Sequence, residues 1–475
     1  MTRCARAILT LWTLIMAGCA VGPDYHEPPV DLPARWSEAP AASEHAAGTP
    51  SRWWTVFEDP ELDSLVDRAI RANLDLQRAE ARVRESRANR TVSAAPLWPQ
   101  LTAGGEYTRS LQSENASSGG SFGGQSPDPT NLYQANFDAT WEIDVFGGTR
   151  RSVEAASADL EASIYDRGDV LLTLLGDVAR NYIELRGFQR QLELARQNLD
   201  AQSETLELTR ARYQGGLATD LDVAQAEAQV ETTASDIPTL EISSAQAVHR
   251  LGVLLGEAPG TLATELSESR PIPAAPSALP AGLPSDLLRR RPDVRRSERQ
   301  LAAATAQIGV ATADLYPKFS LVGSAGLESI SASDFFTAGS KLWSFGPTIT
   351  WPIFQGGRIV ATIEVRDAQE QQALLTYRQT ILVALEDVEN AIVEFTREHD
   401  RRETLAEAAR SNQRAVDYAT SLYSRGLTNF LNVLDAQRNL YQTQNDLAQS
   451  EATVSTDLVA LNKALGGGWE AFPLP

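Results

Sequence analysis

The chain has 475 residues, a net charge of −20 and a sequence pI near 4.7. This acidic balance argues against a nucleic-acid partner, because binding a phosphate backbone requires a basic surface. The four histidines, His26, His45, His249 and His399, are scattered without the spacing of metal ligands. The sequence also lacks a nucleophile elbow, a phosphate loop and a dinucleotide fingerprint, so we expect neither an enzyme nor a metal or cofactor site.

The N-terminus has the pattern of a lipoprotein signal peptide. The apolar run Ala7–Ala17 is too short to span a bilayer, and Met16–Cys19 (Met-Ala-Gly-Cys) indicates a site of cleavage and acylation. We expect residues 1–18 to be removed and Cys19 to carry N-palmitoyl and S-diacylglycerol groups that hold the protein on a membrane. Ala20, rather than Asp, follows Cys19, as in lipoproteins that pass to the outer membrane. The alternative is a buried cysteine in an N-terminal helix.

Beyond a first helix, the chain alternates between apolar and polar residues. In the run Leu132–Phe146 every second residue is apolar or aromatic, and the residues between include Asp138, Glu142 and Asp144. A membrane strand needs about ten residues of such alternation. We therefore predict a β-hairpin at about 97–146 whose acidic face lines a lumen that favours cations. A soluble β-sandwich would show the same alternation.

The next segment carries a seven-residue repeat. Apolar residues recur at every seventh position of 164–213, and the returning segment shows the same step at Val223, Val230, Ile237 and Leu251. Such heptads predict a left-handed coiled coil, here an antiparallel helical hairpin at 152–256 whose outgoing helix is ~90 Å long. Pro238 lies inside the return helix, and we expect a kink there.

The turn of this helical hairpin is specified by its residues. Gly216 supplies the left-handed position that ends a helix, and Thr219 can cap the next helix, with Asp222 completing a capping box. A tight αα turn would explain the glycine by itself. Because Tyr213 and Leu217 recur with it later in the chain, we favour a tip surface with a binding role.

The second half of the chain repeats the first. Tyr213–Ala226 aligns without a gap to Tyr423–Ala436, 423 − 213 = 210 residues later, and a second offset of 293 − 75 = 218 relates the preceding helices. A duplication of this length predicts the same elements twice. The second set is a helix, a β-hairpin at about 316–354 and a helical hairpin at 358–466. The predicted segments are a signal peptide (1–18), a lipidated arm (19–61), a first repeat (62–256), a Pro-rich linker (257–283), a second repeat (284–466) and a C-terminal tail (467–475).

This organisation gives four membrane strands per chain, which cannot close a barrel. An open edge in lipid would leave backbone groups without hydrogen-bond partners, so the strands of several chains must join. Two, three or four chains would supply 8, 12 or 16 strands, all of them permitted counts. The predicted fold class is therefore mainly α with transmembrane β, built from duplicated long antiparallel helical hairpins.

Four segments carry distinctive motifs. They are Ala17–Tyr25 (AGCAVGPDY), Gly282–Asp293 (GLPSDLLRRRPD), Gly346–Arg358 (GPTITWPIFQGGR) and Tyr423–Gln437. They resemble the signatures of the outer-membrane efflux factors, in the NodT-type lipoprotein branch related to TolC, and the resemblance covers nearly the whole chain. It implies a homotrimer in the cell outer membrane that shares a 12-stranded barrel and continues as an α-barrel through the periplasm. It also implies a periplasmic membrane-fusion adaptor and an inner-membrane transporter, commonly of the resistance-nodulation-division (RND) class.

The resemblance further implies the roles of individual residues. It places the closed periplasmic gate at Leu431, Asn432 and Asp435, where three copies of Asp435 would repel one another unless cations bind between them. The alternative is that Leu431 and Leu434 belong to the hairpin core and Asp435 is a solvated helix residue. The implied adaptor contacts at the two hairpin tips are Tyr213, Gly216, Leu217, Thr219, Asp222, Tyr423, Gly426, Leu427 and Asn429.

One position departs from the family pattern. Some relatives carry a basic residue two places after the second-copy glycine, Gly426, where this chain has Thr428. A salt-bridge latch to Asp222 would therefore need another donor, such as Arg425.

The implied function is that of a passive exit duct in a tripartite efflux pump, with multidrug resistance as the expected consequence. The duct would pass small molecules or drugs from the inner-membrane transporter to the exterior. The same fold would also serve metal-ion export or type I protein secretion, and the sequence hardly discriminates among these cargoes, although the NodT-type signatures favour small molecules. A third possibility is a structural lipoprotein that only spans the periplasm, although such a protein would need no alternating strands.

Overall fold

The computed structural model describes residues 20–38, 51–111, 113, 128–276 and 286–472. Cys19 and the expected signal peptide lie outside these residues. The strands are β1 (Gln100–Ser110), β2 (Thr130–Ile143), β3 (Lys318–Ser329) and β4 (Lys341–Thr350). The α-helices are α2 (Pro60–Ala72), α3 (Leu74–Ala94), α4 (Gly148–Gln214), α5 (Asp220–Leu254), α6 (Leu287–Arg290), α7 (Pro292–Ala313), α8 (Arg358–Ser424) and α9 (Phe430–Ala464). Short 3-10 helices are η2 (Trp53–Phe57), η3 (Ala95–Leu97), η5 (Ala338–Ser340) and η6 (Trp469–Ala471).

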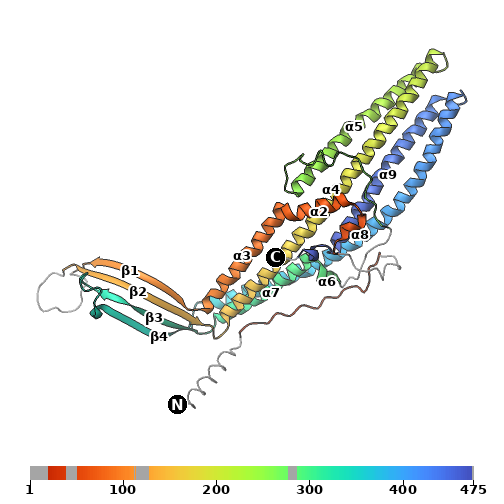
Figure 1. Cartoon of the computed structure of the whole chain (residues 1–475). Helices are drawn as coiled ribbons and strands as arrows, with labels where there is room; N and C mark the ends of the chain where they lie inside the picture. Colours follow the sequence, from red (N-terminus) through yellow and green to blue (C-terminus); the bar gives the residue numbers. More distant parts are fainter. Residues whose placement is uncertain (1–19, 39–50, 112, 114–127, 277–285, 473–475) are drawn as a thin grey trace. The chain divides into compact units, whose positions relative to one another are not determined.

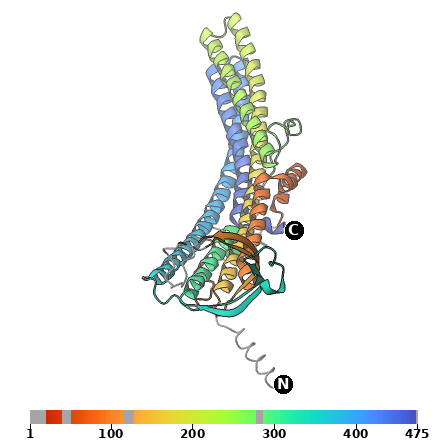
Figure 2. The same cartoon turned by 90° about the vertical axis from the view of Figure 1, so that its left-hand side faces the viewer.

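The helical hairpins of the two halves have equal dimensions. α4 and α8 each contain 67 residues, and α5 and α9 each contain 35. At ~1.5 Å per residue the outgoing helices are ~100 Å long, slightly longer than expected because α4 begins at Gly148 rather than Ser152. Figure 1 and Figure 2 both show α5 beside α4 and α9 beside α8. Pro238 lies within α5, which continues past it, so the expected kink does not interrupt the helix.

The heptad positions form the core of these hairpins. In α4, Leu171, Val178 and Leu185 are fully buried, as the seven-residue spacing predicts. Glycines bring α4 close to α9, since a Cβ at Gly187 would lie 3.0 Å from the Cβ of Ala452. In the part of the chain that the structure describes, no helix combines the length and apolar character needed to cross a membrane. The buried heptad counterparts in α8 are Ile381, Val388 and Phe395.

The chain divides into two compact units. The first contains residues 1–28, 83–162 and 297–376 and includes the sheet, whereas the second contains 29–82, 163–296 and 377–475. Because α3, α4, α7 and α8 are long, each contributes residues to both units. The second unit has its own apolar core, in which Trp53 and Trp54 are almost completely buried together with side chains of α2, α4, α5 and α9.

The four strands form one antiparallel sheet in the order β1-β2-β3-β4. The central pair joins the two halves of the chain, with Phe137 of β2 opposite Ala325 of β3. Within the described sheet, β1 and β4 are the edges and have one partner each. The register pairs odd-numbered residues with odd-numbered ones, so they share one face. That face carries the exposed apolar side chains Leu101, Tyr107, Phe137, Trp343, Phe345 and Ile349.

A tryptophan indole in each β-hairpin forms a hydrogen bond with the segment that precedes the hairpin. The Nε1–H of Trp141 donates to the carbonyl of Leu97 at 3.0 Å, and that of Trp351 donates to the carbonyl of Leu315 at 3.0 Å. The two bonds are equivalent by duplication, since 351 − 141 = 210 and 315 − 97 = 218. Each half of the chain therefore closes the base of its β-hairpin in the same way.

The second strand of the first β-hairpin ends earlier than its alternation predicts. The apolar and polar residues alternate to Phe146, but β2 ends at Ile143. Asp144 leaves the strand because its carboxylate accepts the backbone N–H groups of Thr149 at 3.1 Å and Arg150 at 2.9 Å. The last acidic residue predicted for the lumen thus satisfies the free N–H groups at the start of α4 instead.

Candidate functional site at the tips of the helical hairpins

Both helical hairpins turn through the same backbone motif. Gly216 and Gly426 have φ values of +73° and +74°, a conformation that side chains with a Cβ rarely adopt. The amide of Leu217 donates to the carbonyl of Arg212 at 2.8 Å, and the corresponding bond of Leu427 is 2.9 Å long. These bonds form a Schellman motif at the end of α4 and of α8, as the glycines predict.

The return helices are capped by the predicted residues. The hydroxyl of Thr219 accepts the amide of Asp222, whose carboxylate accepts the amide of Thr219 at 2.8 Å, so the capping box is complete. Asn429 caps α9 by accepting the amide of Asn432 at 3.3 Å. No ion pair joins Asp222 to Arg425 among the residues that the structure describes, because the carboxylate is used within its own turn.

The two tips differ at the tyrosine that they share. Leu217 and Leu427 are 68% and 69% exposed, so each tip presents an apolar side chain to its surroundings. Tyr213 is 46% exposed, whereas its counterpart Tyr423 is only 3% exposed. Of the two tyrosines assigned to the adaptor contact, Tyr213 offers exposed surface and Tyr423 belongs to the packing between the hairpins.

Arg212 explains this difference. Its guanidinium lies 4.6 Å from the ring centre of Tyr423 and donates to the carbonyl of Tyr423 at 3.0 Å, which ties the end of α4 to the end of α8. The position aligned with Arg212 in the second copy is Leu422, so no equivalent cation reaches Tyr213. The apolar cluster around Tyr423 contains Leu206, Ala226, Phe430, Val433 and Leu434.

The three residues assigned to the gate share the exposed face of α9. Leu431 is 46% exposed, and Asn432 and Asp435 are also exposed. Asn432 donates from Nδ2 to the hydroxyl of Thr428 at 2.6 Å, which orients its amide at the tip. Leu434 is 1% exposed and lies in the core, as the alternative reading expected, but Leu431 does not. The arrangement leaves Leu431 and Asp435 one helical turn apart on a surface that faces away from this chain's own core.

A polar seam joins the first helical hairpin to α9 beyond the tip. The amide of Gln437 donates to the hydroxyl of Thr205 at 2.8 Å, and Arg438 donates to the amide oxygen of Gln229 at 2.6 Å. Burial, assisted by a hydrogen bond to Asp236, raises the pKa of Tyr441 to about 12. Heptad periodicity does not indicate these pairs, because each joins helices that are distant in sequence. The remaining pairs of the seam are Tyr441 with Asp236 and Asn198 with Gln444.

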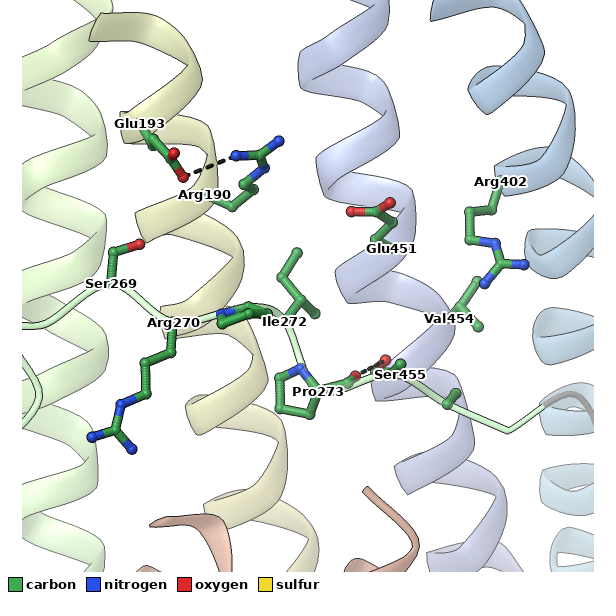
Figure 3. Close-up of a pocket in the computed structure, with 13 residues that line it drawn as sticks. Arg190, Glu193, Ser269, Arg270, Ile272, Pro273, Arg402, Glu451, Val454 and Ser455 are labelled. Carbon is green, nitrogen blue, oxygen red and sulfur yellow. Dashed lines mark hydrogen bonds and ion pairs between the residues drawn. The ribbon is translucent and has the colours of Figure 1, made fainter. Parts of the chain in front are cut away.

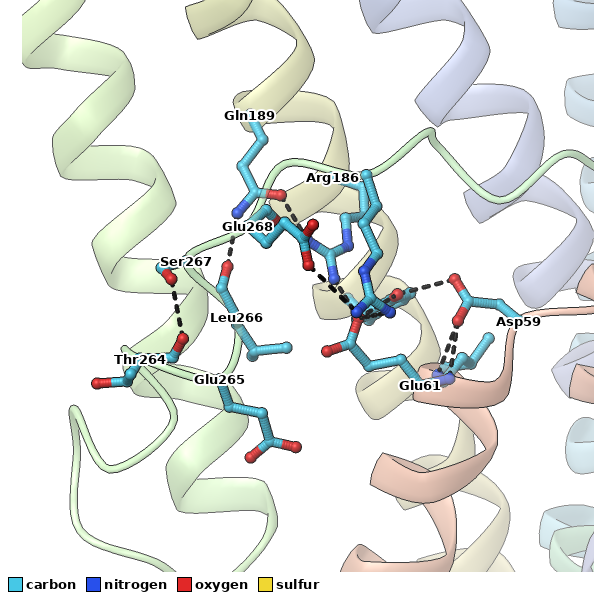
Figure 4. A network of polar contacts seen from close by, with 12 residues as sticks. Asp59, Glu61, Arg186, Gln189, Thr264, Glu265, Leu266, Ser267 and Glu268 are labelled. Carbon is cyan, nitrogen blue, oxygen red and sulfur yellow. Dashed lines mark hydrogen bonds and ion pairs between the residues drawn. The ribbon is translucent and has the colours of Figure 1, made fainter.

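A buried network fixes α2 and the segment 257–276 on α4, as Figure 4 shows. Arg186 is fully buried and donates to Glu61, to the amide oxygen of Gln189 at 2.7 Å and to the carbonyl of Glu268 at 2.7 Å. The hydroxyl of Tyr182 donates to Asp59 at 2.8 Å, and burial raises the pKa of this tyrosine. The start of α2 and the segment after α5 are therefore held by the same guanidinium.

A pocket of about 400 Å³ lies beside this network, between α4, α8, α9 and residues 269–275. Figure 3 shows Glu451 between Arg190 and Arg402. Burial raises the pKa of Glu451, while the two arginines oppose that shift. Ser455 donates to the carbonyl of Pro273 at 2.6 Å and so fixes the wall of the pocket. Within the described residues, no group of three or more His, Cys, Asp or Glu side chains could hold a metal ion.

Asp457 on α9 gives the helical unit a pH-dependent stability. Burial, together with Glu394 and Glu398, raises its pKa from 3.8 to about 7, although Arg180 opposes the shift. The folded chain therefore holds a proton that the unfolded chain releases, and stability falls as the pH rises from about 4 to 7. We expect Asp457→Asn to raise the melting temperature at pH 8 and to leave it nearly unchanged at pH 4.

The control for this prediction is Asp417→Asn, which removes an exposed carboxylate from α8. Melting temperatures of the detergent-solubilised proteins would be compared in steps between pH 4 and pH 8. The assignment of the raised pKa to Asp457 would be contradicted if Asp457→Asn raised the melting temperature equally at pH 4 and pH 8. It would also be contradicted if Asp417→Asn gave the same increase.

Comparison with known proteins identifies the family of this arrangement. Residues 65–257 and 283–467 match the family model of the outer membrane efflux protein. Nodulation protein T of Rhizobium leguminosarum bv. trifolii is 34% identical over 467 residues, which cover 98% of each chain. The pyoverdine export outer membrane protein OpmQ of Pseudomonas aeruginosa is 35% identical over 463 residues, 96% of each chain.

Solved structures show the same fold. The outer-membrane channel OprN has a TM-score of 0.89 at 34% identity, covering 95% of this chain and 100% of that one. For CusC the TM-score is 0.81 at 28% identity, with the same coverage. The mainly helical chain with a four-stranded antiparallel sheet matches these TolC-like channels, which confirms the expected resemblance. The chain therefore belongs to the outer membrane efflux protein family.

Proposed function

We propose that this chain is the exit duct of a tripartite efflux pump, located in the cell outer membrane with its helical hairpins extending into the periplasm. One observation carries the proposal: a single chain joins a sheet with an exposed apolar face to helices ~100 Å long. The sheet is suited to lipid and the helices to crossing an aqueous compartment. The family consists of outer-membrane efflux channels, in agreement with this division.

The working form of the duct is a homotrimer. β1 and β4 are edge strands whose outer backbone groups have no strand partner within the described part of one chain. In lipid such edges require partners, and three chains would join their sheets into a closed barrel of 3 × 4 = 12 strands. Members of the family form trimeric channels that work with an adaptor and an inner-membrane transporter. This supports three chains in the assembly.

Cys19 anchors the mature chain through N-palmitoyl and S-diacylglycerol groups. The support is the sequence Met16–Cys19 and the apolar run before it. Mass spectrometry of the N-terminal peptide is expected to show a chain that begins at Cys19 and carries three acyl chains. A peptide that retains residues 1–18, or begins at an unmodified Cys19, would refute the modification.

The hairpin tips serve as the adaptor contact and the gate. An adaptor would bind the apolar surface of three exposed side chains, which are Leu217, Leu427 and Tyr213. The capped turns fix the positions of these side chains. The face of α9 with Leu431, Asn432 and Asp435 supplies the gate, because it is exposed in one chain and can meet its copies in a trimer.

The lumen is expected to favour cations. Asp138 and Glu142 lie on the even-numbered face of the sheet, opposite the exposed apolar face. Glu106, Glu328 and Lys318 share that face, so a trimer would place 4 × 3 = 12 carboxylates and three ammonium groups inside the barrel. In a salt gradient, the reversal potential of single channels should indicate a cation permeability about threefold that of anions or more. The double variant Asp138→Asn, Glu142→Gln should bring the ratio toward one.

The matched control is Glu227→Gln, which removes an exposed carboxylate from α5 and leaves the strands unchanged. Anion preference of the unmodified channel would contradict the lumen assignment, as would an equal effect of the control.

The exported substances follow from the partners more than from the duct. Relatives carry names that refer to pyoverdine export and toluene efflux, and they are similar to this chain at 35% and 32% identity. We propose small molecules as the cargo. Deletion of the gene should sensitise the host to the substrates of the partner transporter, and the wild-type gene should restore resistance. A deletion strain with unchanged susceptibility and unchanged accumulation of these compounds would refute the efflux role.

A further inference from the structure

The residues that follow Cys19 are held on the first unit by specific contacts. The amide of Val21 donates to the carbonyl of Phe146 at 3.0 Å, in the short connection between β2 and α4. This bond joins the N-terminal arm to the end of the sheet, although the two are separated by 146 − 21 = 125 residues. The segment Ala20–Tyr25 is therefore attached at its first residues, directly behind the expected acylation site.

Arg151 on α4 is the main contact of this segment. Its side chain is only 4% exposed and donates to the carbonyls of Val21 at 3.1 Å and Gly22 at 3.4 Å. It also pairs with the carboxylate of Asp24 at 2.7 Å, and this hydrogen bond and charge lower the pKa of Asp24. The second carboxylate partner of Arg151 is Glu154 at 2.8 Å, so the guanidinium is fixed from both sides.

Glycines let the arm approach α7 with backbone against backbone. Gly22 has φ +92°, and a Cβ on it would lie 2.4 Å from the Cα of Gly309 in α7. A Cβ on Gly309 would in turn lie 2.9 Å from the carbonyl oxygen of Val21. Gly147 makes a similar approach, because a Cβ there would lie 2.7 Å from the Cα of Ala20. Side chains at these three positions would therefore displace the arm.

Tyr25 closes the far end of the docked segment. Its hydroxyl donates to Oε1 of Glu298 at 2.6 Å, and Glu298 is 1% exposed. The ring packs against a buried cluster of Ala158, Ala302 and Ala303, from α4 and α7, with the guanidinium of Arg299 5.5 Å from its centre. Small side chains on both helices thus leave room for one aromatic ring.

We propose that Ala20–Tyr25 is a built-in docking peptide and that α4 and α7 form its receptor, which sets where the acylated N-terminus enters the membrane. Cys19 directly precedes Ala20 in the sequence. Ala20 lies against Gly147, only 147 − 143 = 4 residues after β2 ends. The anchor is then a fixed part of the sheet base, so its acyl chains enter the lipid beside the strands. This inference rests on the proposed acylation of Cys19.

Hydrogen exchange of the full-length acylated protein in lipid nanodiscs tests the docking. Within peptides that cover 20–27, the amide of Val21 should exchange slowly in the wild type because it donates to the carbonyl of Phe146. Arg151→Gln should speed this exchange about tenfold or more, since it removes the bonds through which a charged donor holds the arm in place. Arg180→Gln is the matched control, because it removes a charge from the same helix, 180 − 151 = 29 residues further along, where the side chain pairs with Glu184 at 2.9 Å. The control should exchange like the wild type.

A second variant covers the case in which Arg151→Gln disturbs the helices. Gly22→Ala adds only a methyl group to the arm, and exchange of α4 and α7 peptides reports whether the receptor stays folded. The docking inference fails if peptides 20–27 of the wild type exchange as fast as an unstructured chain, or if neither variant speeds them. The mass of the same N-terminal peptide reports acylation separately, so an unmodified Cys19 would refute the anchor while the exchange data still decide the docking.

Discussion

Truncating Leu431 and Asp435 together to alanine is expected to turn a mostly closed channel into a mostly open one. Leu431 is about half exposed in a single chain, so closing the gate in a trimer would bury the rest of it, about 1 kcal/mol for each copy. Three copies give ~3 kcal/mol, which corresponds to a change of about 100-fold in the ratio of open to closed channels. Single-channel recording in planar bilayers measures this ratio directly.

The duplication of the chain supplies a matched control for the gate. Leu221 and Gln225 occupy the first-repeat positions aligned with Leu431 and Asp435, since 431 − 221 = 210 and 435 − 225 = 210. Leu221 is 65% exposed, so Leu221→Ala with Gln225→Ala removes similar surface from the other tip. Cells with the gate variant should also become sensitive to vancomycin, a large antibiotic, and cells with the control should not. Unchanged conductance and unchanged vancomycin sensitivity of the gate variant would refute the assignment.

Arg186→Met is expected to destabilise the helical unit more than any other substitution considered. The substitution leaves the carboxylate of Glu61, 10% exposed, without its main partner and frees the carbonyl of Glu268. Breaking a buried ion pair from one side costs about 3 to 5 kcal/mol. We expect the lower end, because Arg270 remains 3.0 Å from Glu61. Guanidinium-induced unfolding of the detergent-solubilised protein provides the measurement.

One helical turn away, Arg190→Met offers the comparison. Arg190 pairs with Glu193 at 2.9 Å, but both side chains are more than 40% exposed, so the loss should be below about 1 kcal/mol. The double variant Arg186→Met, Glu61→Met should recover part of the stability, since it leaves no unpaired charge. If Arg186→Met and Arg190→Met lowered the free energy of unfolding equally, the network in Figure 4 would contribute little to stability.

Local periodicity predicts the long helices and the strands of the fold. The heptads of 164–213 indicated a long helix because each buried position recurs within one continuous element, and Leu171, Val178 and Leu185 are indeed core residues. The alternation in Leu132–Phe146 likewise indicated a strand with one apolar face. The limit of this reasoning appears at Asp144, where a helix cap rather than the alternation decides the end of β2.

Sequence patterns do not predict contacts between segments that are distant in the chain. Tyr213 and Tyr423 are aligned in the duplication, yet only Tyr423 is buried, because Arg212 lies over its ring. Position 212 differs between the copies, and this difference was the signal available in the sequence. Neither the docking of Ala20–Tyr25 on α4 nor the role of Arg186 follows from local spacing, since each depends on where remote helices pack.

The most direct test of the gated exit duct is planar-bilayer conductance of the purified protein, with the mass of its oligomer determined on the same sample. We expect a trimer whose channels are small, mostly closed and selective for cations. A monomer that shows no conductance after reconstitution with its acyl chains intact would contradict the shared barrel and the duct.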